Sequence, residues 1–274
     1  MPEVQDSQNS ELPTVTTSIY HLNFFVSEVG GDRIVVKNIT PPGVEPHDYE
    51  PTARDLVQIQ KSKLLFISSE DFEPWGSKIK KDMVGTGVTV IEVSAGLVEN
   101  NDPHIWLSPE LAKKEVEVIT DELIKADEGS TQYFLENEKS LIAKLDKLSM
   151  DFRQGLSSCK EYKVVTSHAA FGYLTQEYGL TQVAISGLTP DEEPSTKQMI
   201  EIAKEAEKDK LKYIFFEKLV SPKLAETIAQ EIGAKTLVLD PIEGISDNDR
   251  SQGKNYLTIM EENLANLRIA LECQ

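Results

Sequence analysis

Short apolar runs alternate with amphipathic stretches along most of the chain. In the first half, the runs that we expect to form strands are 15–20, 32–39, 63–69 and 88–94. The stretches with a helical pattern between them are 21–29, 53–61 and 74–84. Near-continuous apolar strands separated by helices are typical of a parallel sheet that is covered on both faces. The pattern therefore predicts an α/β layer domain in this half.

The second half repeats this alternation. Its expected strands are 162–168, 181–186, 213–218 and 235–240. Each is followed by a predicted helix, over 169–178, 194–208, 221–232 and 253–272. A second parallel sheet is expected here.

A long helix is predicted between the two halves, from Thr131 to about Leu156. Its apolar residues recur at spacings of 7, 4, 3, 4 and 4 residues, from Phe134 to Leu156. At 1.5 Å per residue this helix spans roughly 40 Å, and it contains no proline. We therefore expect an α/β protein of two lobes joined by one rigid helix: a disordered tail (1–13), an N-terminal lobe (14–129), a linking helix (130–158) and a C-terminal lobe (159–274).

Charge and composition narrow the function. The net charge of −18 over 274 residues argues against a nucleic-acid partner, because binding phosphates requires a basic balance. No apolar run approaches the roughly 20 residues of a membrane helix. Residues 1–12 have neither the basic nor the apolar segment of a signal peptide, so we expect that any export signal has been removed.

Four side chains follow or end predicted strands, where open α/β sheets place their ligands. His47 lies in a loop that Pro41, Pro42 and Pro46 stiffen, so the segment leading to it should be an extended arm. His104 precedes a helix capped by Ser108, and His168 and Asp240 end their strands. These residues either share one metal site or are unrelated polar residues at strand ends, and their spacing leaves both interpretations open.

Three imidazoles and one carboxylate are ligands that suit zinc, and together they complete a tetrahedral shell. A shell without an open position favours metal binding over catalysis. No phosphate-loop, dinucleotide, serine-hydrolase or HExxH motif is present, so we expect no catalytic site and no enzyme activity. Cys159 and Cys273 form no CxxC pair, which excludes a thiolate zinc ribbon.

Four segments, in this order, resemble the motifs of the metal-specific solute-binding proteins of ABC importers, the zinc and manganese group that includes ZnuA, TroA and PsaA. They are PPGVEPHDYEPTARD, NDPHIWLSPE, VVTSHAAFGYLTQEYGL and AKTLVLDPIEG. The resemblance runs from about Thr16 to the C-terminus. It implies two lobes joined by a long helix, with a metal held in the cleft between them by His47, His104, His168 and Asp240.

The resemblance also implies a function. The expected protein is an extracytoplasmic receptor, soluble in the periplasm or lipid-anchored, that captures Zn²⁺ and delivers it to a membrane permease as a monomer. Histidine at 168 favours zinc, but the short, His-free segment before His104 keeps a manganese or mixed carrier as an alternative. A two-lobed, chelatase-like metalloenzyme is the alternative from another class. An adhesin role has no support in the sequence.

Three further predictions concern single residues. His21 lies after the first strand and is interpreted as a non-ligand near the cleft. Glu217 either orients a ligand through its carboxylate or is structural. Cys159 and Cys273 stand at the start of the second lobe and the end of its last helix, so an exported protein should join them in a disulfide, with two unlinked cysteines as the alternative.

Overall fold

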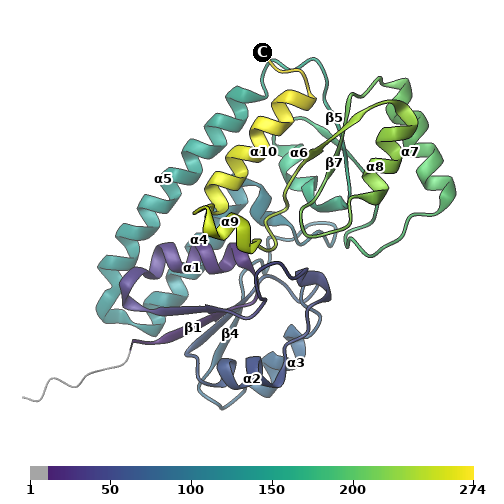
Figure 1. Ribbon diagram of the computed structural model, residues 1–274. Helices are drawn as coiled ribbons and strands as arrows, with labels where there is room; N and C mark the ends of the chain where they lie inside the picture. The colour runs from purple at the N-terminus through teal and green to yellow at the C-terminus, as the bar shows by residue number, and fades with distance from the viewer. Residues whose placement is uncertain (1–11) are drawn as a thin grey trace, which may run out of the picture.

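The computed structural model describes residues 12–274, which form two α/β lobes (Figure 1). The predicted fold class is confirmed, although each strand has only four residues and is shorter than predicted. The predicted tail, 1–13, lies almost entirely outside the described residues. None of the helices within 12–274 is long and apolar enough to cross a bilayer.

The N-terminal lobe is built on one four-stranded parallel sheet in the order β2-β1-β3-β4. Its strands are β1 (Thr14–Thr17), β2 (Val35–Asn38), β3 (Leu64–Ile67) and β4 (Thr89–Glu92). Its helices are α1 (Tyr20–Gly30), α2 (Ala53–Gln60), α3 (Gly76–Asp82) and α4 (Pro109–Ala126). Short 3-10 turns lie at η1 (Gly31–Arg33), η2 (Pro46–Asp48), η3 (Ile105–Leu107) and η4 (Glu128–Ser130).

Strand β3 shows why this sheet is covered on both faces. All four of its residues are buried. Because side chains alternate along a strand, Leu64 and Phe66 enter the core shared with α1 and α4, whereas Leu65 and Ile67 pack with residues of α2 and α3. The continuous apolar run therefore reflects burial on both sides.

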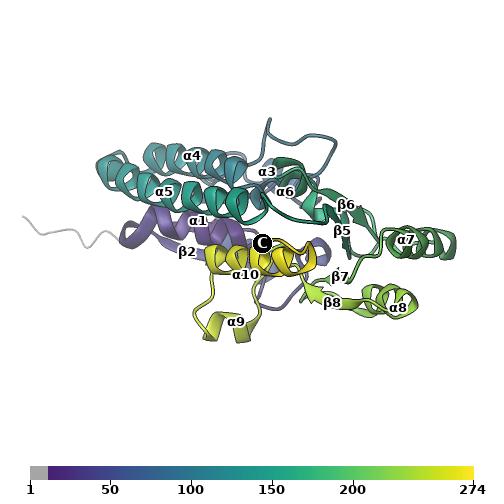
Figure 2. The ribbon, with the colours of Figure 1, turned by 90° about the horizontal axis from the view of Figure 1, so that it is seen from above.

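Helix α5 (Thr131–Gly155) runs along one flank of the molecule from the N-terminal lobe towards the C-terminal lobe (Figure 1). The apolar positions predicted to form its buried face are buried, from Phe134 to Leu156. In the view from above, α5 lies beside α4 and the last helix, α10 (Tyr256–Ala270) (Figure 2). The helix is thus packed along its length.

The C-terminal lobe differs from the expected single sheet. Its strands form two separate parallel pairs, β5 (Lys163–Thr166) with β6 (Thr181–Ala184), and β7 (Tyr213–Phe216) with β8 (Lys235–Val238). The pairing direction is as predicted, but no backbone ladder joins the pairs in this described lobe. Helical elements here are η5 (Ala169–Phe171), α6 (Gly172–Glu177), α7 (Thr196–Lys208), α8 (Lys223–Ile232) and α9 (Asp247–Ser251).

Two local predictions are corrected. The predicted helix 253–272 begins later, at Tyr256, because Gly253 adopts a φ of 74° after α9 and Asn255 caps α10. The arm before His47 is not extended throughout, since Pro46 begins the turn η2 that contains the histidine. Proline suits the first position of such a turn, where its missing N–H is not needed.

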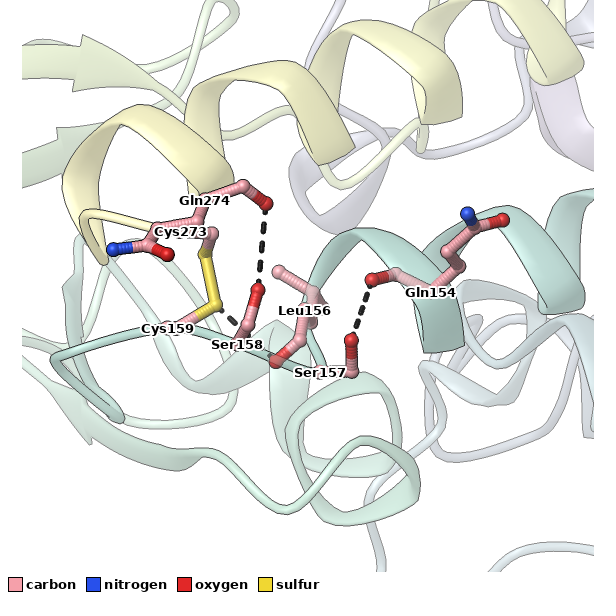
Figure 3. The surroundings of a disulfide bond; sticks show 7 residues. All are labelled: Gln154, Leu156, Ser157, Ser158, Cys159, Cys273 and Gln274. Carbon is pink, nitrogen blue, oxygen red and sulfur yellow. Dashed lines mark hydrogen bonds between the residues drawn. A yellow bond between two sulfur atoms is a disulfide. The ribbon is translucent and has the colours of Figure 1, made fainter.

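The predicted disulfide is present. Cys159 follows α5 and Cys273 follows α10, and their sulfur atoms are bonded (Figure 3). The Ser158 hydroxyl donates to the Gln274 carbonyl at 3.3 Å beside this link. The bond closes a loop with a sequence separation of 114, which spans the whole C-terminal lobe.

Candidate metal centre

The three predicted histidines lie together between the lobes. His47 is held in η2, His104 precedes η3 and His168 precedes η5. Each follows the carboxyl end of a strand, β2, β4 or β5. The ring centroids are 5.6 Å apart for His47 and His104, 5.8 Å for His47 and His168, and 5.3 Å for His104 and His168.

The fourth member of the cluster is Glu243, not the predicted Asp240. Its Oε1 lies 3.4 Å from Nε2 of His47 and 3.2 Å from Nε2 of both His104 and His168. One potential ligand atom from each of these four residues lies within 4.8 Å of all the others. Sequence reasoning missed Glu243 because DPIEG offers two acids three residues apart, and position at a strand end favours the first.

Asp240 is buried nearby but faces its own lobe. Its Oδ1 accepts the backbone N–H of Ile242 at 2.9 Å, and its Oδ2 lies 3.5 Å from Nζ of Lys218. Burial raises the pKa of Asp240 to about 6, against the opposing effects of that N–H and Lys218. These contacts occupy both carboxylate oxygens, and they account for its place outside the histidine cluster.

Four atoms of the cluster are buried without a hydrogen-bond partner in the described structure. They are Nε2 of the three histidines and Oε1 of Glu243. The side chains of His104 and His168 are fully buried, and that of Glu243 is 1% exposed. Buried polar atoms are normally paired. Three nitrogens and one oxygen that converge without partners fit the donor set that zinc takes in a tetrahedral site.

Carboxylates behind two of the rings fix their orientation. His104 Nδ1 lies 2.7 Å from Oδ1 of Asp102, and His168 Nδ1 lies 2.7 Å from Oε1 of Glu217. The orienting contact considered for Glu217 is therefore present, and Asp102 was missed. Such contacts leave Nε2 free of its proton for a metal and raise the basicity of the ring.

Burial and the neighbouring charges shift the pKa values of the cluster in opposite directions. Burial alone lowers the pKa of His104 and His168, but Asp102 and Glu243 raise that of His104, and Glu217 and Glu243 raise that of His168 well above its usual range. Burial opposes ionisation of Glu243, yet the three imidazoles hold its pKa well below the usual value. A negative oxygen is thus favoured at the centre.

His21 lies outside this cluster. It is fully buried on α1, where its ring stacks on Trp106 with centroids 4.1 Å apart. Its Nε2 is 3.6 Å from Oε1 of Glu115. Trp106 in turn packs against His104 and donates its indole N–H to the carbonyl of Pro241 at 2.7 Å. His21 and Trp106 thus pack behind the cluster.

Comparison with known proteins also points to zinc. Residues 15–270 match the family described as "ZnuA: Zinc-uptake complex component A periplasmic". The high-affinity zinc uptake system protein ZnuA of Bacillus subtilis is 38% identical over 97% of this chain and 89% of its own length. The zinc-binding lipoprotein AdcA of Streptococcus pneumoniae is 36% identical over 93% of this chain, which spans only 55% of AdcA.

A solved structure is also similar. The Zn(II)-bound ZnuA-like domain of Streptococcus pneumoniae AdcA superposes with a TM-score of 0.86 and 37% identity, covering 96% of this chain and all of that domain. At this coverage the similarity includes both lobes of the chain. The chain therefore belongs to the ZnuA family of periplasmic zinc-uptake components.

Proposed function

We propose that this chain captures Zn²⁺ outside the cytoplasm and delivers it to the membrane permease of an ABC importer. One observation carries the proposal: the converging, buried and unpartnered Nε2 atoms of three histidines and Oε1 of Glu243. Bringing a cation to this point gives all four atoms a partner at once. The names of the Bacillus and Streptococcus relatives support zinc as that cation.

In this proposal the ligands are His47, His104, His168 and Glu243, and Asp240 is not one of them. Four protein ligands complete a tetrahedral zinc shell, whereas catalytic zinc normally keeps a position for water or substrate. The site is therefore suited to carrying the ion rather than to activating a water molecule. Turnover of a substrate is not expected.

Zinc is favoured over manganese by the donor atoms. Imidazole nitrogen suits zinc, whereas manganese prefers oxygen-rich octahedral sites. Three nitrogens and one carboxylate leave manganese short of oxygen ligands. A mixed zinc and manganese carrier is the second candidate, which a competition experiment separates from the first.

Two observations support an extracytoplasmic location. The Cys159–Cys273 disulfide suits an oxidising compartment. The Streptococcus pneumoniae relative is named a lipoprotein, so a lipid anchor on the outer face of the membrane is one form of this location. We expect a monomer that meets the permease, and light scattering of the purified chain tests the monomeric state.

The function is tested by metal analysis and titration. Protein purified without added metal should contain close to one zinc per chain by elemental analysis. After the metal is stripped, competition against a chromophoric chelator should give tight binding of one Zn²⁺ and much weaker binding of Mn²⁺. Glu231→Gln, on the exposed surface of α8, is the control that should leave both values unchanged. Equal affinities would favour the mixed carrier, and absence of stoichiometric metal would contradict the proposal.

A further inference from the structure

The loop that follows β8 carries Glu243 and is bonded to the opposite lobe. Alternate carbonyl groups of this loop, from Pro241, Glu243 and Ile245, accept hydrogen bonds from the N-terminal lobe. The donors are Trp106 Nε1 at 2.7 Å, the Tyr20 N–H at 3.2 Å and the Gly43 N–H at 3.0 Å. Although the loop begins in the C-terminal lobe, one side of its backbone is thus bound to the other lobe.

The start of the loop is anchored in its own lobe through Asp240. Asn263 on α10 accepts the Asp240 N–H at 2.8 Å and donates to the Asp240 carbonyl at 2.7 Å. The carboxylate then accepts the N–H of Ile242 and lies beside Lys218. Asp240 therefore joins the fixed end of the loop to the residue that precedes Glu243.

Ile242 has an unusual backbone. Its φ is 58°, in the left-handed region, and its side chain is completely buried. A β-branched residue is rarely found there, and such conformations persist only where the surroundings impose them. The hydrogen bond from Ile242 N–H to Asp240 Oδ1 is a direct constraint of this kind. The turn that it closes directs the next side chain, Glu243, into the histidine cluster.

We propose that Asp240 is the positioning residue for Glu243. Its Oδ1 holds Ile242 in the left-handed conformation and so sets the direction of the Glu243 carboxylate. This inference rests on the proposed zinc site and deepens it, since it assigns a role to the acid that is not a ligand. Asp240 contributes a hydrogen-bond acceptor for the Ile242 N–H. It does not contribute a bond to the metal.

One consequence is a coupling between the loop and the contact of the lobes. The loop backbone that presents Glu243 also binds Tyr20, Gly43 and Trp106 across the cleft. If Ile242 leaves the left-handed conformation, Glu243 turns out of the cluster and the adjoining carbonyl groups lose alignment with the N-terminal lobe. Asp240 thus links retention of the ion to the contact between the lobes.

The test compares two substitutions at one position. Asp240→Asn keeps an oxygen that accepts the Ile242 N–H but removes the charge, whereas Asp240→Ala removes the acceptor. We expect Asp240→Asn to bind zinc within a few-fold of the unchanged protein. We expect Asp240→Ala to bind zinc about 10- to 100-fold more weakly, as is typical when a residue supporting a metal ligand is lost.

A spectroscopic readout separates positioning from general destabilisation. The Co²⁺-loaded protein should give the same visible spectrum in the unchanged chain and Asp240→Asn, whereas Asp240→Ala should shift as water replaces Glu243. The melting temperature without metal reports folding separately. If Asp240→Ala does not fold, Asp240→Glu keeps the charge near Lys218 but displaces the acceptor, and it too should weaken zinc and alter the cobalt spectrum.

Several outcomes overturn the inference. Equal zinc affinity in Asp240→Ala and the unchanged protein would show that the hydrogen bond does not position Glu243. Equal losses in Asp240→Asn and Asp240→Ala would mean that the charge of Asp240 matters and not its acceptor. Failure of His168→Ala to weaken zinc would overturn the proposed site, and this inference with it, so the two failures are distinguishable.

Discussion

The first lobe holds its half of the cluster with local structure, whereas the second lobe holds its half with contacts between distant segments. His104 is oriented by Asp102, only two residues away, through both its backbone N–H and its ring. His47 lies in the turn that Pro46 begins, and the Phe72 ring packs on it with centroids 4.3 Å apart. The sheet beneath them is continuous.

The second lobe has no continuous sheet and supports its residues from farther away. His168 is oriented by Glu217, 49 positions along the chain. The loop that carries Glu243 is anchored through Asn263 and is bonded to Trp106 of the other lobe. This half of the site therefore depends on the tertiary fold and should be the more sensitive to changes away from the ligands.

Removing one histidine from each lobe should have the largest effect and should distinguish the lobes. His47→Ala and His168→Ala should each lower zinc affinity by orders of magnitude, because each removes one of four bonds. His168→Ala also removes the imidazole beside Oε1 of the buried Glu217, which keeps only the His168 backbone N–H at 3.2 Å, so it should lower the unfolding free energy of the metal-free protein by a further ~1–3 kcal/mol. Calorimetric zinc titration and urea unfolding measure the two quantities. Equal stability of the two variants would contradict the difference between the lobes.

The disulfide should stabilise the second lobe selectively. Changing Cys159 and Cys273 together to serine opens the long loop and should cost about 4–5 kcal/mol in the chain-entropy model. Hydrogen exchange should show lost protection mainly in β5–β8, with β1–β4 little changed. Zinc affinity should persist, because neither cysteine touches the cluster. Uniform loss of protection would mean that the lobes unfold as one unit.

The two carboxylates that orient histidine rings, Glu217 and Asp102, allow a matched pair of substitutions. Glu217→Gln and Asp102→Asn each keep an oxygen acceptor but remove a charge, and each should lower zinc affinity by about 10- to 100-fold. The loss should be greater for Glu217, whose side chain is 3% exposed, than for Asp102, at 15%. Competition titration of both variants against one chelator gives the ranking, and the reverse ranking would count against it.

Zinc affinity should fall as the pH falls. Ligation requires neutral imidazoles, and a free histidine has a pKa of about 6.5. Burial opposes protonation, but the surrounding carboxylates raise the pKa of His104 and His168 in the metal-free protein. Protons therefore begin to compete with zinc at a pH above the ordinary pKa of histidine. Zinc affinity should rise with pH until the rings of His104 and His168 are neutral. Titrations from pH 5 to 8 measure this, and a constant affinity would indicate other ligands.

The smallest effect should be on overall shape. Helix α5 contains no proline, and it packs against α1, α4 and α10, so it should bend little. Scattering curves of the metal-free and zinc-loaded protein should nearly superimpose, while zinc raises the melting temperature by binding the native state. A large compaction on binding would show that the lobes move about a hinge instead.

The same contrast between local and long-range contacts explains which features could be predicted from the sequence. Ser108 as a helix cap and the apolar face of α5 act through near neighbours, and their effects could be inferred from residue order. The strand-end rule brings the three histidines to one region because it depends only on chain direction, and the structure gathers them in one cluster. The choice between Asp240 and Glu243 could not be made in this way, since it depends on Ile242 turning left-handed and on contacts with Asn263, Lys218 and Tyr20. Likewise, the strand pattern of the sequence does not indicate that the strands of the second lobe form two separate pairs.

The central claim is that one zinc ion lies between the lobes on three histidines and Glu243. A crystal structure of the zinc-loaded protein, with anomalous diffraction measured on both sides of the zinc absorption edge, tests it most directly. One strong anomalous peak should lie at bonding distance from Nε2 of His47, His104 and His168 and from the Glu243 carboxylate. A peak bonded to Asp240 in place of Glu243, or one located outside the cluster, would contradict it.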